Sequence, residues 1–158
     1  MNHERRSCMK VLVAGMVIAA AMSACSDSSD VRSLDAKTAD QVVQRRSVTI
    51  PDAFSFGQMT EYGTFQGRPS YSGRYDGPAI AFEDAASLNS KNPEFPPMRP
   101  VLCEDPILAS PGWGSVGFSC TKHMLVTQHP LYGVIDTVTL LLTSDGVRAH
   151  LFIRAVGN

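Results

Sequence analysis

The chain has 158 residues, of which 44% are hydrophobic and 18% are charged, and its formal net charge is −1. This length suggests a single domain, and the apolar share excludes a chain that stays unfolded throughout. The lack of a basic excess argues against nucleic-acid binding, which needs clustered Lys and Arg to neutralise phosphates.

The first segment of the chain has the pattern of an export signal. Arg5, Arg6 and Lys10 precede an unbroken apolar run from Val11 to Met22. At 1.5 Å per residue a helix of this length spans about 18 Å, which is short of the ~30 Å hydrocarbon core of a bilayer. The run therefore suits a cleaved leader better than a permanent membrane span.

The apolar run ends at Met22-Ser23-Ala24-Cys25, which resembles the lipobox of bacterial lipoproteins. The resemblance implies that residues 1–24 are removed and that Cys25 carries acyl chains such as palmitate. Several chains on one cysteine meet the physical need for more than one anchor. Ser26 follows the cysteine, which in Gram-negative bacteria of the enteric type implies an outer-membrane lipoprotein facing the periplasm. An ordinary secretory leader with a chance cysteine is the alternative.

Removal of the leader leaves 11 basic and 14 acidic residues, a mildly acidic chain. Ser26 to Asp30 are small, polar and charged, so we expect residues 25–33 to form the lipidated cysteine and a flexible tether. Residues 34–158 are expected to form a single globular envelope domain. Asp35 to Arg46 is predicted to be a helix, because its apolar positions share a face and Arg45 and Arg46 suit a helix C-terminus. The apolar positions are Leu34, Ala39, Val42 and Val43.

From Ser47 onward the pattern favours short strands separated by turns. Residues 54–77 alternate glycines with aromatic residues, which is typical of short antiparallel strands. Asp84 is predicted to cap a brief helix through Leu88. Four prolines between Asn92 and Pro100 indicate an ordered connector rather than a regular element. Further strands are expected at Ser47 to Ile50, Ala79 to Phe82, Val101 to Cys103 and Gly117 to Cys120.

The end of the chain predicts a β-hairpin. Thr137 to Thr143 and Val147 to Val156 flank Asp145-Gly146, a pair typical of type I′ turns because both central positions need positive φ. This register predicts an apolar ladder on one face and a mixed face on the other, either partly covered or open to a partner. The expected fold class is α+β, mainly antiparallel sheet with one or two short helices. The ladder pairs Leu142 with Ala149, Leu140 with Leu151, and Val138 with Ile153.

Two cysteines remain for the folded domain. Cys8 leaves with the leader and Cys25 is the lipid site that the resemblance implies, so Cys103 and Cys120 are predicted to form a disulfide in the oxidising exported compartment. Closing this loop contributes about 3 kcal/mol. A metal site is the alternative, but the spacing of the nearest histidines fits no familiar zinc pattern. We therefore expect no metal and no cofactor.

The sequence contains no catalytic motif in a suitable context. Gly112 to Gly117 matches G-x-G-x-x-G, but without a strand before it and a helix after it the segment is interpreted as a flexible turn with an exposed or half-buried Trp113. No serine lies in a nucleophile elbow, and His150 is expected on the sheet surface. We assign no catalytic residues. The histidines of the mature chain are His123, His129 and His150.

These observations favour a lipid-anchored envelope domain that acts by protein–protein binding. Its sharpest form is an inhibitor or immunity-type neutraliser of a cell-wall hydrolase or toxin. Aromatic residues are enriched at interfaces, although the same rings also suit a small core. Alternatives are a structural or assembly subunit of an envelope or secretion complex, a small-ligand carrier, and a small enzyme. The candidate partner-binding residues are Tyr62, Tyr71, Tyr75 and Trp113.

Overall fold

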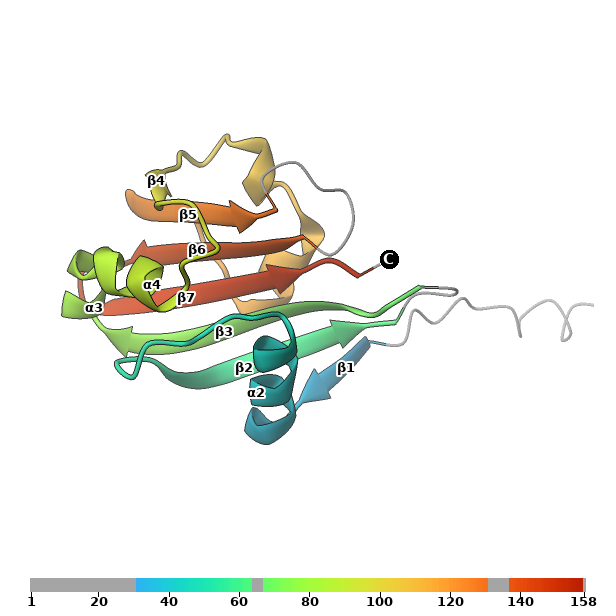
Figure 1. The fold of residues 1–158 in the computed structure, drawn as a ribbon. Coiled ribbons are helices and arrows are strands. Elements are labelled where there is room, and N and C mark those ends of the chain that lie inside the picture. The colour runs from blue at the N-terminus through green and yellow to red at the C-terminus, as the bar shows by residue number, and fades with distance from the viewer. Residues whose placement is uncertain (1–30, 64–66, 131–136, 158) are drawn as a thin grey trace, which may run out of the picture.

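The computed structural model describes residues 31–63, 67–130 and 137–157. These residues form a seven-stranded antiparallel sheet in the order β1-β2-β3-β7-β6-β5-β4, with short helices on its faces (Figure 1). The strands are β1 (Val31–Leu34), β2 (Ser55–Tyr62), β3 (Ser70–Pro78), β4 (Arg99–Pro100), β5 (His123–His129), β6 (Val138–Ser144) and β7 (Arg148–Ala155). The helices are α2 (Ala36–Arg45), α3 (Ile80–Glu83) and α4 (Ala85–Lys91), with 3₁₀ turns η1 (Pro106–Leu108) and η2 (Pro111–Val116). The predicted fold class is confirmed.

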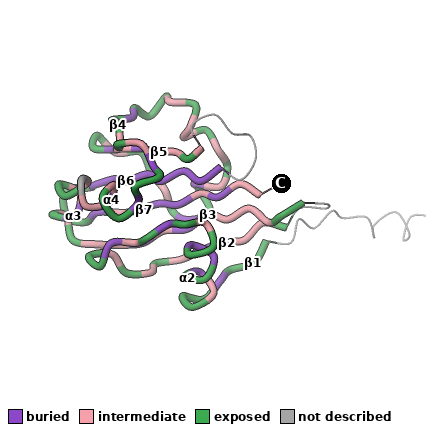
Figure 2. The backbone as a smooth tube through the Cα atoms, in the orientation of Figure 1, coloured by how far each residue is buried: buried purple, intermediate pink, exposed green. Residues whose placement is uncertain are grey.

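Both faces of the sheet are covered. On one face α2 packs its buried residues onto the sheet, and on the other face η2 places Trp113 and Val116 against it. Successive strand residues point to opposite faces, so Leu140 and Leu142 enter the first core while Leu141 enters the second. These three leucines are at most 1% exposed, and Figure 2 shows the buried stretches along β6 and β7. The predicted mixed face is therefore largely covered.

Helix α2 forms where the apolar spacing predicts it. Asp35 is the N-cap, and its carboxylate accepts a hydrogen bond from the Thr38 backbone N–H at 2.9 Å. This bond satisfies an amide that the first turn leaves without a partner. The helix ends before Ser47, whose φ of 55° is left-handed. The helix residues that face the core are Ala39, Val42 and Val43.

The C-terminal hairpin is confirmed and lies at the centre of the sheet, but its predicted register is wrong by two residues. The backbone N–H of Asp145 bonds to the carbonyl of Arg148 at 3.2 Å, so Gly146 and Val147 form the centre of the turn. Of this pair only Gly146 has a positive φ, 88°, which fits a type II′ turn rather than type I′. A shift of two keeps every residue on its predicted face. The observed pairs are Leu142 with Leu151, Leu140 with Ile153, and Val138 with Ala155.

Several predicted strands are not strands. Ser47 to Ile50 is irregular, and Ala79 to Phe82 lies largely in helix α3. The backbone N–H of Val101 donates one further hydrogen bond to the carbonyl of Met124 beyond β4, and the chain then turns. Residues 117–120 are irregular. Asp84 precedes α4 as expected, but its side chain makes no capping bond. Short apolar runs do not distinguish strand from helix.

Three strands lie where none was expected. β4 occupies Arg99–Pro100, at the end of the predicted connector, and pairs with β5. β5 pairs along its whole length with β6. β1 pairs Val31 with Tyr62 and Leu34 with Met59, so the folded domain includes residues that we had assigned to the tether. A four-residue strand with one buried side chain carries almost no periodic signal.

Candidate functional site

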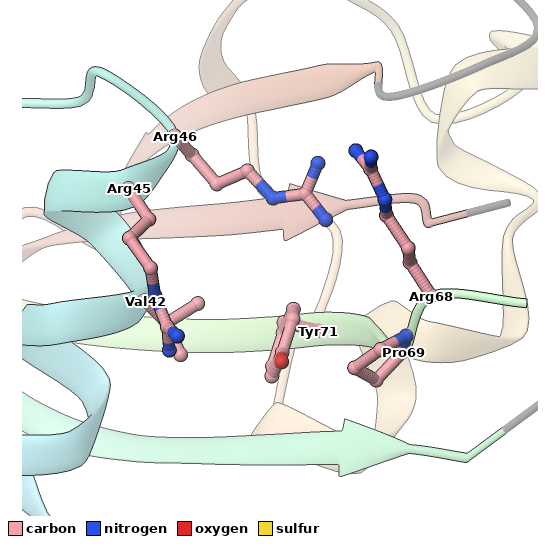
Figure 3. A pocket seen from close by; sticks show the side chains of 6 residues that line it. All are labelled: Val42, Arg45, Arg46, Arg68, Pro69 and Tyr71. Carbon is pink, nitrogen blue, oxygen red and sulfur yellow. The ribbon is translucent and has the colours of Figure 1, made fainter.

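A pocket of about 370 Å³ lies where the end of α2 meets the beginning of β3. Three arginines, a proline, a valine and a tyrosine line it. Figure 3 shows Arg46 and Arg68 extending toward each other from the two segments, with Tyr71 between Arg45 and Pro69. We call this group the arginine pocket. Its described lining residues are Val42, Arg45, Arg46, Arg68, Pro69 and Tyr71.

The fold itself brings these groups together. Arg45 is the last residue of α2 and Arg46 is its C-cap, a position where positive charge offsets the negative end of the helix dipole. The Arg45 Nε–H donates to the carbonyl of Gln41 at 3.2 Å, which holds the side chain along the helix. Tyr71 enters from β3, where it pairs with Glu61 of β2 and Ala155 of β7.

Tyr71 stays a hydrogen-bond donor at neutral pH. Partial burial and the nearby Glu61 carboxylate raise the pKa of the Tyr71 phenol, while Arg45, Arg46 and Arg32 act in the opposite direction. Guanidinium groups present rigid, always-charged N–H donors that match carboxylate and phosphate oxygens. The described lining contains no carboxylate, histidine, serine or cysteine. The arrangement suits the binding of an oxyanion.

Two of the predicted partner-binding residues are core residues instead. Trp113 is 1% exposed, and its indole N–H donates to the carbonyl of Ile107 at 3.0 Å. Tyr75 is 2% exposed and packs edge-on against Phe56 at 5.8 Å between ring centroids. Neither ring is available to a partner. The expectation of an exposed or half-buried Trp113 was wrong because η2 folds back over the sheet and inserts the indole against Phe152.

Tyr62 is half-buried and connects two elements. Its hydroxyl bonds to the hydroxyl of Ser115 in η2, so it fastens the end of β2 to the segment that covers the second core. Of the four predicted contact residues, Tyr71 is the one that lines the arginine pocket. The other predicted contact residues do not gather around it.

A second polar cluster lies at the other end of β3 and β7. His150 Nδ1 is 2.6 Å from an oxygen of Asp76, and His150 Nε2 is 3.8 Å from Asp145. Arg74 Nε lies 3.1 Å from the same Asp76 carboxylate. In the sheet His150 pairs with Thr143 of β6 and Asp76 of β3. Both imidazole nitrogens face carboxylates, so among the described residues neither nitrogen is directed at a serine, threonine or cysteine that it could activate as a nucleophile.

The described residues also bear on the remaining site predictions. The Cys103–Cys120 disulfide is present, with the two Cα atoms 5.8 Å apart. Cys25, the predicted lipid site, lies outside the described residues. In the described ranges no three His, Cys, Asp or Glu side chains converge as metal ligands, and no helix is both long and apolar enough to cross a membrane.

Comparison with family models, with curated proteins and with solved structures finds no match for this chain.

Proposed function

We propose that this protein is a lipid-anchored cell-envelope lipoprotein that acts by binding a protein partner rather than by catalysis. The lipobox-like segment ending at Cys25 supports the anchor. The sheet begins at Val31, six residues later, and six residues span at most about 20 Å. The anchor therefore holds the domain close to the membrane surface, with periplasm-facing attachment to the outer membrane if the cell is Gram-negative.

The arginine pocket is the observation that carries the binding function. It gathers three guanidinium groups and a phenol on a chain that is otherwise mildly acidic. Such a local concentration of donors attracts an acidic group and fixes its orientation. The partner contributes an acidic side chain or its carboxy terminus, which enters the pocket beside Tyr71.

In its most concrete form the protein is an inhibitor or immunity-type neutraliser of a cell-wall hydrolase or toxin. A domain with a disulfide and a sheet covered on both faces is a rigid scaffold, and rigid surfaces lose less entropy on binding. An anchor of this kind keeps the neutraliser at the membrane where its target acts.

Two measurements test the proposal separately. Labelling cells with radioactive palmitate tests the anchor: the wild-type chain becomes labelled and Cys25→Ser does not. Affinity capture with unlipidated residues 26–158 tests the binding function, with retained proteins identified by mass spectrometry. We expect one soluble hydrolase or toxin at equal stoichiometry. A large membrane assembly instead favours a structural subunit, and retention of nothing contradicts the binding proposal.

A further inference from the structure

A second cavity lies on the face of the sheet that η1 and η2 cover. It is an open groove of about 460 Å³ between η1 and the strands β5, β6 and β7. Pro106, Ile107 and Val156 form an apolar part, and Ser110, Thr139 and Arg154 contribute polar groups. The exposed surface of the groove is mainly polar, with these apolar residues forming a patch beside the polar groups. A ligand that has both a charged and an apolar part therefore suits it better than a wholly apolar one.

Arg154 is the unusual residue of this groove. It lies in β7 between Ser72 of β3 and Thr139 of β6, half-buried in the sheet. Within the described ranges no carboxylate is within salt-bridge distance of its guanidinium. Burial lowers the pKa of the Arg154 guanidinium, an effect that the phenol of Tyr62 opposes. Removing a cation from water without a counter-charge is costly, so this position favours the arrival of an anion.

Segment η2 packs closely beside Arg154 and Ser72. A Cβ atom at Gly112 would lie 2.5 Å from the Ser72 hydroxyl and 3.5 Å from Arg154 Nε. Only glycine therefore allows η2 to approach this closely. The hydroxyl oxygen of Ser110 is buried and bonds to none of the described residues. A half-buried guanidinium and a residue with a buried, unpaired hydroxyl thus line the same groove.

We propose that this groove binds a small amphipathic carboxylic acid. Arg154 pairs with the carboxylate, and the apolar body of the ligand lies on Pro106, Ile107 and Val156. A single guanidinium matches a single carboxylate through two parallel hydrogen bonds. The volume of the groove lies within the range of known ligand pockets. The site is separate from the arginine pocket, so it stands whether or not a protein partner binds there.

The test is a titration of unlipidated residues 26–158 with hexanoate. The Nε–H NMR signals of the arginines monitor binding at each step. Hexanamide, which has the same chain without the charge, and inorganic phosphate, which has charge without the chain, are titrated in parallel. We expect hexanoate to shift the Arg154 signal saturably, with clearly weaker effects from the other two probes. No saturable shift, or equal shifts from hexanamide or phosphate, would overturn the proposal.

Variants assign the binding to Arg154. Arg154→Gln is expected to weaken hexanoate binding about tenfold or more, measured by calorimetry. Arg148→Gln is the matched control, because Arg148 is exposed at the other end of β7, and it should bind like wild type. Arg154→Lys keeps the charge but lacks the planar guanidinium group. Its circular dichroism spectrum should match that of the wild type, and it should still bind hexanoate more weakly. Wild-type affinity in both Arg154 variants contradicts the assignment.

Discussion

The side-chain amide of Asn92 pairs with both backbone groups of Thr49, 43 residues away in the chain. Asn92 Oδ1 accepts from the Thr49 N–H at 2.7 Å, and Asn92 Nδ2 donates to the Thr49 carbonyl at 2.9 Å. Nδ2 also donates to the carbonyl of Leu88 at 2.8 Å. This buried amide takes the place of a neighbouring strand and ties residues 47–50 to the end of α4.

Replacing Asn92 should therefore destabilise the domain strongly. Asn92→Ala removes three hydrogen bonds, two of them part-buried and the one to Leu88 buried, which we expect to cost about 3 kcal/mol in the free energy of unfolding. Urea denaturation measures this cost. Ser90→Ala is the control, because its exposed hydroxyl bonds only within the helix, and it should cost less than about 0.5 kcal/mol. Equal losses in both variants would contradict the role given to Asn92.

Two tyrosine-to-phenylalanine substitutions should have opposite effects on stability. The hydroxyl of Tyr75 is buried and bonds to none of the described residues, and burial, with a smaller effect of Asp40, raises the pKa of its phenol to about 12. Tyr75→Phe removes a desolvated polar group and should be neutral or stabilising by up to about 1 kcal/mol. Tyr62→Phe loses the bond to Ser115 and should cost about 1 kcal/mol. Matching losses in thermal unfolding would show that the Tyr75 hydroxyl has a partner.

Asp145 should make the hairpin turn sensitive to acid. Its carboxylate accepts the backbone N–H groups of Arg148 and Val147 at 2.7 and 2.8 Å, and these bonds lower the pKa of Asp145 below its ordinary value of 3.8. A lowered folded-state pKa stabilises the fold above the ordinary value, and this contribution is lost as the pH falls through the folded value.

The variant Asp145→Ala tests this dependence. Its urea midpoint should lie below that of the wild type near neutral pH, and the difference should narrow as the pH falls below 3.8. Midpoints measured across this range provide the comparison. A difference that stays constant, or that widens in acid, would show that the Asp145 carboxylate does not hold the turn.

The disulfide should stabilise the segment that covers the second core. Cys103 and Cys120 are 17 residues apart, and closing a loop of this size contributes about 3 kcal/mol by the chain-entropy model. The double variant Cys103→Ser, Cys120→Ser should lose this amount in urea denaturation. Trp113 is the only tryptophan of the chain and lies inside the loop, so its fluorescence reports the loss locally. A reducing agent should destabilise the wild type but leave the double variant unchanged.

The sequence predicts the elements whose side chains repeat with one clear period. Helix α2 and the β6–β7 hairpin are in this class, because the helix buries one stripe and the hairpin alternates across the sheet. Segments held by distant side chains were not predictable in this way. Residues 47–50 have strand composition, yet their hydrogen bonds go to Asn92. The turn type depends on the place of Asp145. Its carboxylate can accept backbone hydrogen bonds from a position before the turn, or the residue can lie at the turn centre, and composition does not distinguish the two.

The candidate site was only partly visible in the sequence. Tyr71 was singled out for its residue type, but Arg45, Arg46 and Arg68 meet it only because the end of α2 lies over the start of β3. Trp113 and Tyr75 were chosen by the same reasoning and are buried, because both faces of the sheet are covered. A basic pair at a helix end was the usable signal, and it indicates a site only once the neighbouring strand is known.

The central claim is that the arginine pocket binds an acidic group of a protein partner. The most direct measurement compares the amount of partner captured from envelope and secreted fractions by unlipidated wild type, Arg45→Glu and Arg148→Glu. Arg45 lines the pocket, whereas Arg148 is exposed at the opposite end of the sheet. We expect the wild type and Arg148→Glu to retain the same protein and Arg45→Glu to lose it. Equal retention by all three proteins would contradict the claim.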